Sequence, residues 1–125
     1  MIVLDASVLI AHLDEGDAQH ERAVERLLAV AGEPFACSPI TRAEVLVGPA
    51  RAKRIDVAAT ALATLGVDDV ALGSDAPVRL ANLRAETGLK LPDCCVILAA
   101  QDAAASQVLT FGARLAREAS RLGIG

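Results

Sequence analysis

The feature that most constrains the fold is an alternation of short apolar runs with longer helical stretches. Residues 1–5 are apolar until they end in an acid, and a helical pattern follows over residues 6–13. A short, continuously apolar run is typical of a strand buried on both faces, as in a parallel sheet. Parallel strands need crossover connections, which the intervening helices supply. We therefore expect an α/β fold, a three-layer α/β/α sandwich with a mostly parallel central sheet.

Turn and cap residues set the other predicted boundaries. Ser38-Pro39 is typical of a helix start, and Gly48-Pro49 of a helix end. The sequence has no internal repeat, linker or low-complexity segment, so we expect a single domain over residues 1–125. Further strands are predicted over 34–37, 69–72 and 108–111, and further helices over 18–30, 38–47, 50–65, 74–88, 91–105 and 113–122.

The composition limits how this chain can bind other molecules. Hydrophobic residues make up 54% of it, so disorder is excluded as the main state. There is no Trp or Tyr and there are only two Phe, which excludes an aromatic platform for stacking RNA bases. The net charge of −4 argues against a broad basic surface, although residues 34–54 hold four bases and only one acid.

The cysteines and the termini favour a cytoplasmic protein. Cys37 and the adjacent pair Cys94 and Cys95 make no disulfide framework, so we expect reduced thiols. No apolar run reaches the roughly 18 residues of a membrane span. The first residues lack the positive leader of a signal peptide. We expect no membrane partner.

Three acids stand at positions that fit either a structural role or a functional one. Asp5 ends the first strand, Glu44 lies in a partly apolar helix, and Asp93 begins the most apolar helix. Taken singly, Asp5 and Asp93 could be helix caps, and Glu44 could be solvated or paired with Arg42. If the three converge at the carboxyl edge of the sheet, they repel one another unless a cation lies among them. Oxygen ligands suit Mg²⁺, or Mn²⁺, and hence metal-assisted hydrolysis of a phosphodiester.

Three segments together carry a family resemblance. They are Ile2-Val3-Leu4-Asp5-Ala6-Ser7, Ser38-Pro39-Ile40-Thr41-Arg42-Ala43-Glu44, and Leu91-Pro92-Asp93 before an Ala-rich helix. In these segments the chain resembles a PIN-domain ribonuclease, and more closely the VapC toxins of bacterial toxin–antitoxin pairs. The resemblance spans nearly the whole chain. It implies a magnesium-dependent endoribonuclease that cleaves RNA, forms a homodimer and is held inactive by a cognate VapB-type antitoxin.

The resemblance also implies roles for individual residues. Asp5 and Asp93 would be the principal Mg²⁺ ligands, with Glu44 binding directly or through water. Ser7 matches a position that supports the first acid by hydrogen bonding, and Thr110 is assigned a supporting place. These assignments make Asp5, Glu44 and Asp93 the predicted catalytic set.

One position departs from the family pattern. After the last strand the family usually has Thr-x-Asp, whereas this chain has Thr110-Phe111-Gly112. Gly112 offers no side-chain ligand, and Asp102 lies on the wrong side of its helix to replace it. The alternative hypothesis is therefore a catalytically weakened or inactive PIN module that binds RNA or an antitoxin.

The remaining motifs give weaker predictions. His12 and His20 are expected to face solvent, because metal activation of water needs no histidine base. Apolar side chains at Leu9, Leu13, Val45 and Leu46 are candidate partner surfaces, with core packing as the alternative. Adhesion, receiver and glycine-loop nucleotide-binding domains are not supported, because their acid or glycine patterns are not met. Seven cations are expected to steer RNA phosphates or to be solvated, namely Arg42, Arg51, Lys53, Arg54, Arg79, Arg84 and Lys90.

Overall fold

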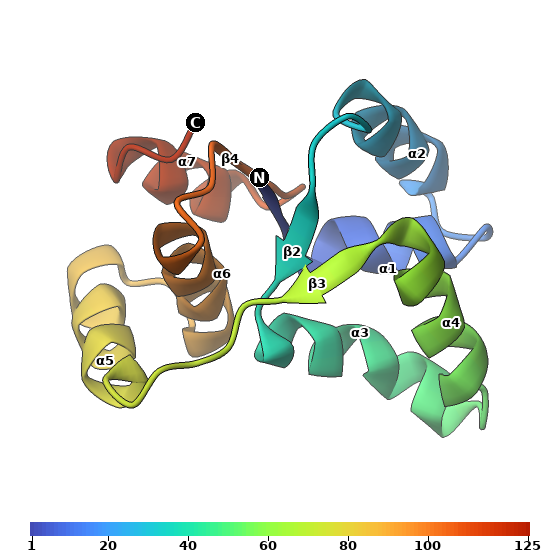
Figure 1. The fold of residues 1–125 in the computed structure, drawn as a ribbon, viewed down its shortest axis with the longest axis horizontal. Helices are drawn as coiled ribbons and strands as arrows, with labels where there is room; N and C mark the ends of the chain where they lie inside the picture. The colour runs from blue at the N-terminus through green and yellow to red at the C-terminus, as the bar shows by residue number, and fades with distance from the viewer.

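The computed structural model describes residues 1–125 as four strands and seven helices that largely alternate along the chain (Figure 1). The elements are β1 (Ile2–Leu4), α1 (Ala6–Leu13), α2 (His20–Ala29), β2 (Phe35–Cys37), α3 (Pro39–Arg51), α4 (Ile55–Leu65), β3 (Val67–Asp69), α5 (Ala76–Thr87), α6 (Leu91–Asp102), β4 (Gln107–Leu109) and α7 (Ala113–Arg121).

The four strands form one sheet in the order β3-β2-β1-β4, and every neighbouring pair is parallel. Ile2 pairs with Phe35 on one side and with Gln107 on the other, so β1 lies inside the sheet. All carboxyl ends therefore meet at one edge. The predicted α/β class with a parallel central sheet is confirmed.

Two hydrophobic cores cover the two faces of the sheet, because alternate side chains of a strand point in opposite directions. Ile2 and Leu4 pack with residues of α1 to α4, whereas Val3 packs with residues of α5, α6 and α7. Figure 1 shows the same division, with α5 to α7 on one side of the strands and α1, α3 and α4 on the other. The three-layer sandwich follows from this division.

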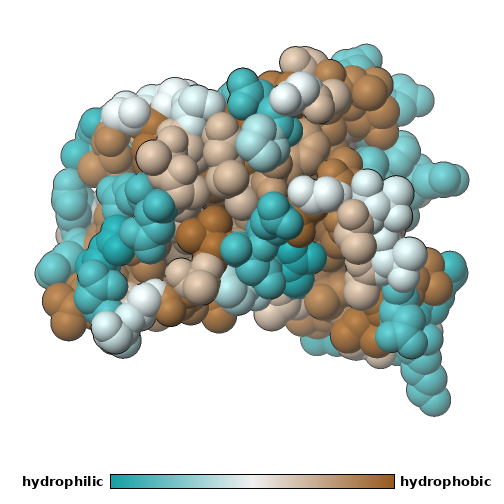
Figure 2. Space-filling view, viewed as in Figure 1, coloured by the Kyte–Doolittle hydropathy of each residue, from teal (hydrophilic) through white to brown (hydrophobic).

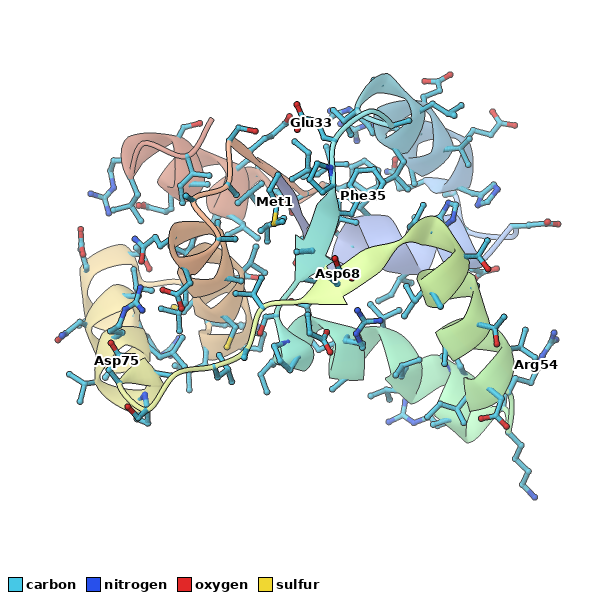
Figure 3. The ribbon with its side chains drawn as sticks, in the orientation of Figure 1. Met1, Glu33, Phe35, Arg54, Asp68 and Asp75 are labelled. Carbon is cyan, nitrogen blue, oxygen red and sulfur yellow. The ribbon has the colours of Figure 1, made fainter.

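The two edge strands differ in charge. β3 carries Asp68 and Asp69, both exposed. Figure 3 labels Asp68 near the centre of the visible face, where Figure 2 shows a hydrophilic patch. Charged side chains on an edge strand discourage pairing with other chains. β4 at the opposite edge has the sequence Gln-Val-Leu and carries no charge of its own. At the start of the chain, the Met1 ammonium lies 3.4 Å from Glu33 Oε2 (Figure 3).

The predicted end of the third helix at Val47 is wrong, because α3 continues through Gly48 and Pro49 to Arg51. Pro49 cannot donate a backbone hydrogen bond, but the last carbonyls of the helix, those of Gly48 and Pro49, still find donors. Ala52 N–H donates to Gly48 O at 3.1 Å, and Arg54 N–H donates to Pro49 O at 2.8 Å. The helix ends where Lys53 adopts a φ of 57°. Residues 50 and 51, predicted to begin the next helix, therefore belong to α3, and that next helix, α4, begins five residues later than predicted, at Ile55.

The third strand lies at Val67–Asp69 rather than at residues 69–72. Pairing with β2 sets this register, because Phe35 is opposite Val67 and Cys37 is opposite Asp69. Arg42 of α3 also holds the strand by donating to Val67 O at 2.6 Å. The fourth strand is likewise shifted, to Gln107–Leu109, and α6 ends at Asp102 rather than at residue 105.

The other predicted elements agree with the structure to within about two residues at each end. Ser38 caps α3 as expected, since its Oγ accepts a hydrogen bond from Ile40 N–H at 3.2 Å. Cys37, Cys94 and Cys95 are buried free thiols. None of the helices combines the length and apolarity that a membrane crossing requires.

Candidate active site

Asp5 is the centre of a buried hydrogen-bond cluster at the carboxyl edge of the sheet. Its backbone occupies the N-cap position of α1, but its side chain makes no capping bond. Instead, Asp5 Oδ2 accepts hydrogen bonds from Ser7 Oγ and from Thr110 Oγ1, both at 2.7 Å. Asp5 remains only 9% exposed. The structure therefore contradicts the capping alternative for Asp5 and fixes its carboxylate in one orientation.

Backbone donors hold the two supporting hydroxyls in turn. Phe111 N–H donates to Ser7 Oγ at 3.1 Å, and Gly112 N–H donates to Thr110 Oγ1 at 2.9 Å. Each hydroxyl thus accepts from the loop after β4 and donates to Asp5. This arrangement directs both O–H groups at the same carboxylate oxygen and leaves Asp5 Oδ1 without a protein donor.

The carboxyl groups of Glu44 and Asp93 lie close enough to Asp5 for its negative charge to shift their pKa values. Partial burial raises the pKa of Glu44, and the carboxylates of Asp5 and Asp93 raise it further. Partial burial also raises the pKa of Asp93, and Asp5 adds to this rise, whereas Lys90 and Arg114 oppose it. The elements α1, α3 and α6 therefore bring the three predicted acids into one electrostatic neighbourhood.

The three acids differ in how they are presented. Asp93 is half-buried in the first turn of α6, where the helix dipole favours a negative charge. Glu44 is exposed at the rim of the site, on α3. It does not pair with Arg42, whose Nε donates to Asp69 Oδ1 at 2.6 Å on β3. The Glu44 carboxylate is consequently left free beside the other two acids.

The donor chemistry of this site fits a hard cation. All three acidic side chains offer oxygen, which Mg²⁺ prefers, and repulsion among them would fall if a cation were bound. No three carboxylate, imidazole or thiol groups converge tightly enough in the structure to enclose one ion by themselves. Magnesium usually binds through one or two carboxylates and keeps several waters, so the looser grouping is compatible with it.

Comparison with known families identifies the family to which the chain belongs. The model of the PIN domain matches residues 2–120, which is nearly the whole chain. The chain belongs to the PIN-domain family. Comparison with curated protein sequences gives no match. The predicted resemblance to PIN-domain proteins is thus confirmed.

Two solved structures resemble this PIN domain. One is VapC20 of Mycobacterium tuberculosis, a toxin that cleaves the sarcin–ricin loop, with a TM-score of 0.78 and 18% identity over 100% of this chain and 97% of that one. The other is a toxin–antitoxin complex from Klebsiella pneumoniae, with a TM-score of 0.69 and 27% identity over 90% of this chain and 87% of that one. Both agree with the predicted VapC-type PIN fold.

Gly112 stands at the site, as the sequence predicts. It is the N-cap of α7, and a Cβ built on it would lie 3.4 Å from Thr110 Oγ1. The position where a fourth acid is expected in this PIN domain is therefore next to the Asp5 cluster but has no side chain. Asp102, by contrast, bonds to Arg79 at 2.6 Å and is not part of the site.

Several weaker predictions need correction. His12 and His20 are half-buried rather than solvent-facing, and a His20 ring nitrogen lies 2.7 Å from Ala11 O. Leu9 and Val45 belong to the core, which excludes them as free partner surfaces. Three of the seven proposed steering cations are already engaged within the PIN domain: Arg42 and Arg79 form ion pairs, and Arg84 donates to Leu89 O.

Sequence reasoning also missed residues beside the site. The positive charge of Arg114, on α7, opposes the rise in the pKa of Asp93. The guanidinium of Arg22 lies 4.7 Å from the centre of the Phe111 ring. Neither contact is local in the sequence, so periodicity and spacing give no sign of them. The only sequence hint is that Phe111, the sole aromatic residue of the β4–α7 loop, lies three positions before Arg114.

The hydroxyl of Thr110 gives a testable prediction. We expect Thr110→Val to lower the free energy of unfolding by about 1–3 kcal/mol, because a buried hydrogen bond to Asp5 and one from Gly112 are lost. Urea denaturation measures this change. Thr87→Val is the matched control, since Thr87 Oγ1 also makes two hydrogen bonds but on α5. RNA cleavage should fall only in the Thr110 variant, and an equal loss in both would contradict a role at the site.

Proposed function

We propose that this PIN domain is a metal-dependent endoribonuclease that acts as the toxin of a toxin–antitoxin pair. The observation that carries the proposal is the buried Asp5 carboxylate, oriented by Ser7 and Thr110 and within electrostatic reach of Glu44 and Asp93. A fixed acid with two companions at the carboxyl edge of a parallel sheet suits metal-assisted hydrolysis of a phosphodiester.

Each residue has a distinct part in this proposal. Asp5 and Asp93 would hold Mg²⁺, or Mn²⁺, and Glu44 would bind it directly or through water. The bound ion supplies a more acidic water and stabilises charge on the phosphate oxygens. Ser7 and Thr110 keep the Asp5 carboxylate in one rotamer, which lowers the entropic cost of binding the ion. Lys90 and Arg114 offset the negative charge around Asp93.

Removal of divalent ions tests the reaction class. With purified protein and a mixed pool of single-stranded RNA, cleavage is expected in Mg²⁺ and is expected to stop in excess EDTA. Restored Mg²⁺ should recover cleavage, whereas Ca²⁺ should recover less, because its larger and more flexible coordination positions the phosphate differently. Full cleavage in EDTA would overturn the metal-dependent mechanism.

A groove of about 500 Å³ between α1, α3 and α4 supports the proposal that the chain binds an antitoxin. Apolar side chains predominate in its lining, and among them Ile10 is 41% and Val57 is 57% exposed. Glu44 forms part of the same lining, so a segment bound there would reach the acids. One of the similar solved structures is a toxin–antitoxin complex. A homodimer also remains a prediction, which light scattering of the purified chain would test.

One observation favours a second candidate function. Gly112 removes any side-chain ligand from the end of β4, so a weakened or inactive PIN module that binds RNA or an antitoxin remains the alternative. Full metal-dependent cleavage by the unmodified chain would reject this alternative.

A further inference from the structure

A second groove, with a volume of about 350 Å³, runs along the outer edge of β4 between α2 and α7. Its lining spans from Gln107, at the start of the strand, to Thr110 and Gly112, just beyond its end. Since β4 is an edge strand, no other strand covers this side. Thr110 both lines the groove and donates to Asp5, so the groove opens directly beside the acid cluster.

The groove is electropositive in a chain whose net charge is −4. Its lining includes Arg22 and Arg26 but no aspartate or glutamate. Both arginines are exposed, and neither forms an ion pair. They lie four residues apart on α2, which places them on the same face of the helix. Two free guanidinium groups therefore face an uncharged strand edge.

Phe111 holds one of these arginines in place. Its ring is half-buried against the core on the α2 side of the sheet, and the guanidinium of Arg22 stacks over it at 4.7 Å. Phe111 N–H also bonds to Ser7, a supporting residue of the active site. Stacking restricts the long Arg22 side chain before any ligand binds, so less entropy is lost on binding a phosphate.

We propose that this groove, defined by Arg22, Arg26 and the β4 edge, is a subsite for single-stranded RNA on one side of the scissile phosphate. The proposal rests on the ribonuclease function proposed above. Arg22 and Arg26 bind successive backbone phosphates, because guanidinium groups match phosphate oxygens in geometry and charge. Thr110 and Gly112 form the junction where the RNA strand passes from the groove to Asp5 and the other two acids.

The contrast between the two sheet edges favours RNA over a polypeptide as the occupant. An extended peptide is recognised at a sheet edge mainly through backbone hydrogen bonds and needs no cations. The β4 edge instead faces two unpaired arginines, which match a polyanion. At the β3 edge, the exposed Asp68 forms no ion pair and repels the same polyanion, whereas Asp69 pairs with Arg42.

RNA binding in EDTA tests the subsite independently of cleavage. The probe is a fluorescein-labelled single-stranded RNA of mixed sequence, and the readout is fluorescence anisotropy at several salt concentrations. Arg22→Gln with Arg26→Gln should bind about tenfold more weakly, and the slope of log K against log salt should fall by about 1.4. Arg22→Lys with Arg26→Lys should retain most of the slope, since it keeps both charges.

Arg117→Gln with Arg121→Gln is the matched control, because it makes the same charge change on α7 outside the groove lining. It should weaken binding much less. Equal loss in both double variants, unchanged affinity in the groove variant, or no RNA binding by the parent would overturn the subsite. Displacement of RNA by polyglutamate at equal charge concentration would overturn it in favour of an acidic polypeptide. Absence of cleavage in Mg²⁺ with intact groove binding would instead reject only the ribonuclease function.

Discussion

Asp5→Asn is expected to lower the rate of RNA cleavage in Mg²⁺ by at least about a hundredfold. A bound metal ion contributes several kcal/mol to stabilising the transition state, and each 1.4 kcal/mol corresponds to a factor of ten. Asparagine keeps one oxygen to accept the hydrogen bonds of Ser7 and Thr110, so the fold should persist. What it removes is the negative charge that would hold the cation.

Two measurements isolate this effect. Calorimetric titration with Mg²⁺ should show weaker binding by the Asp5 variant, and thermal unfolding should show that it remains folded. Asp68→Asn makes the same chemical change at an exposed position on β3 and should cleave RNA like the parent. An unchanged rate of RNA cleavage in the Asp5 variant would contradict the proposed active site, whatever the behaviour of the control.

Gly112→Asp is expected to bind Mg²⁺ about tenfold or more tightly than the parent and to cleave RNA faster. Metal affinity rises with the number of charged ligands and with the rigidity of the site. The backbone at Gly112 has a φ of −77° and a ψ of 115°, and a new Cβ would meet only ordinary contacts. Aspartate is also a better N-cap than glycine by a few tenths of a kcal/mol, so α7 should not be weakened.

Gly112→Asn separates charge from shape in this experiment. Asparagine has nearly the same size and a similar capping preference, but it adds no negative charge. If both variants leave Mg²⁺ affinity unchanged, position 112 is not directed at the metal site. A large gain in cleavage with aspartate alone would show that the parent is the weakened PIN module of the alternative hypothesis.

The sequence was sufficient to predict the features that arise locally. The alternating pattern predicted the parallel sheet, and the carboxyl-edge rule placed Asp5 where the structure has it. The register of β3 was not predictable, because Arg42 contacts Val67 O and Asp69 from a distant helix. The end of α3 was mispredicted because Gly48-Pro49 was treated as a terminator, whereas Ala52 and Arg54 supply donors to the last carbonyls.

In the candidate site, too, contacts between residues close in sequence were predictable and contacts between distant residues were not. The supporting role of Ser7 was implied by the resemblance to PIN domains, and the contact is local, because Ser7 and Asp5 are both on the first turn that follows β1. The role of Thr110 as a donor to Asp5 depends on a pairing between β1 and β4 that no short window contains. The stacking of Arg22 on Phe111 is equally remote in sequence, which explains why the electropositive groove was not foreseen.

The hydrogen bond between Thr110 and Asp5 joins residues 105 positions apart, and this separation determines when the Asp5 cluster can be completed during synthesis. The chain is made from its amino terminus, so Asp5, Glu44 and Asp93 leave the ribosome before β4 does. Contacts of such long range form late in folding. A nascent chain that lacks β4 has neither the second hydroxyl on Asp5 nor the groove floor. Within the proposed function, the Asp5 cluster that would hold the metal ion is therefore completed only after β4 has been made.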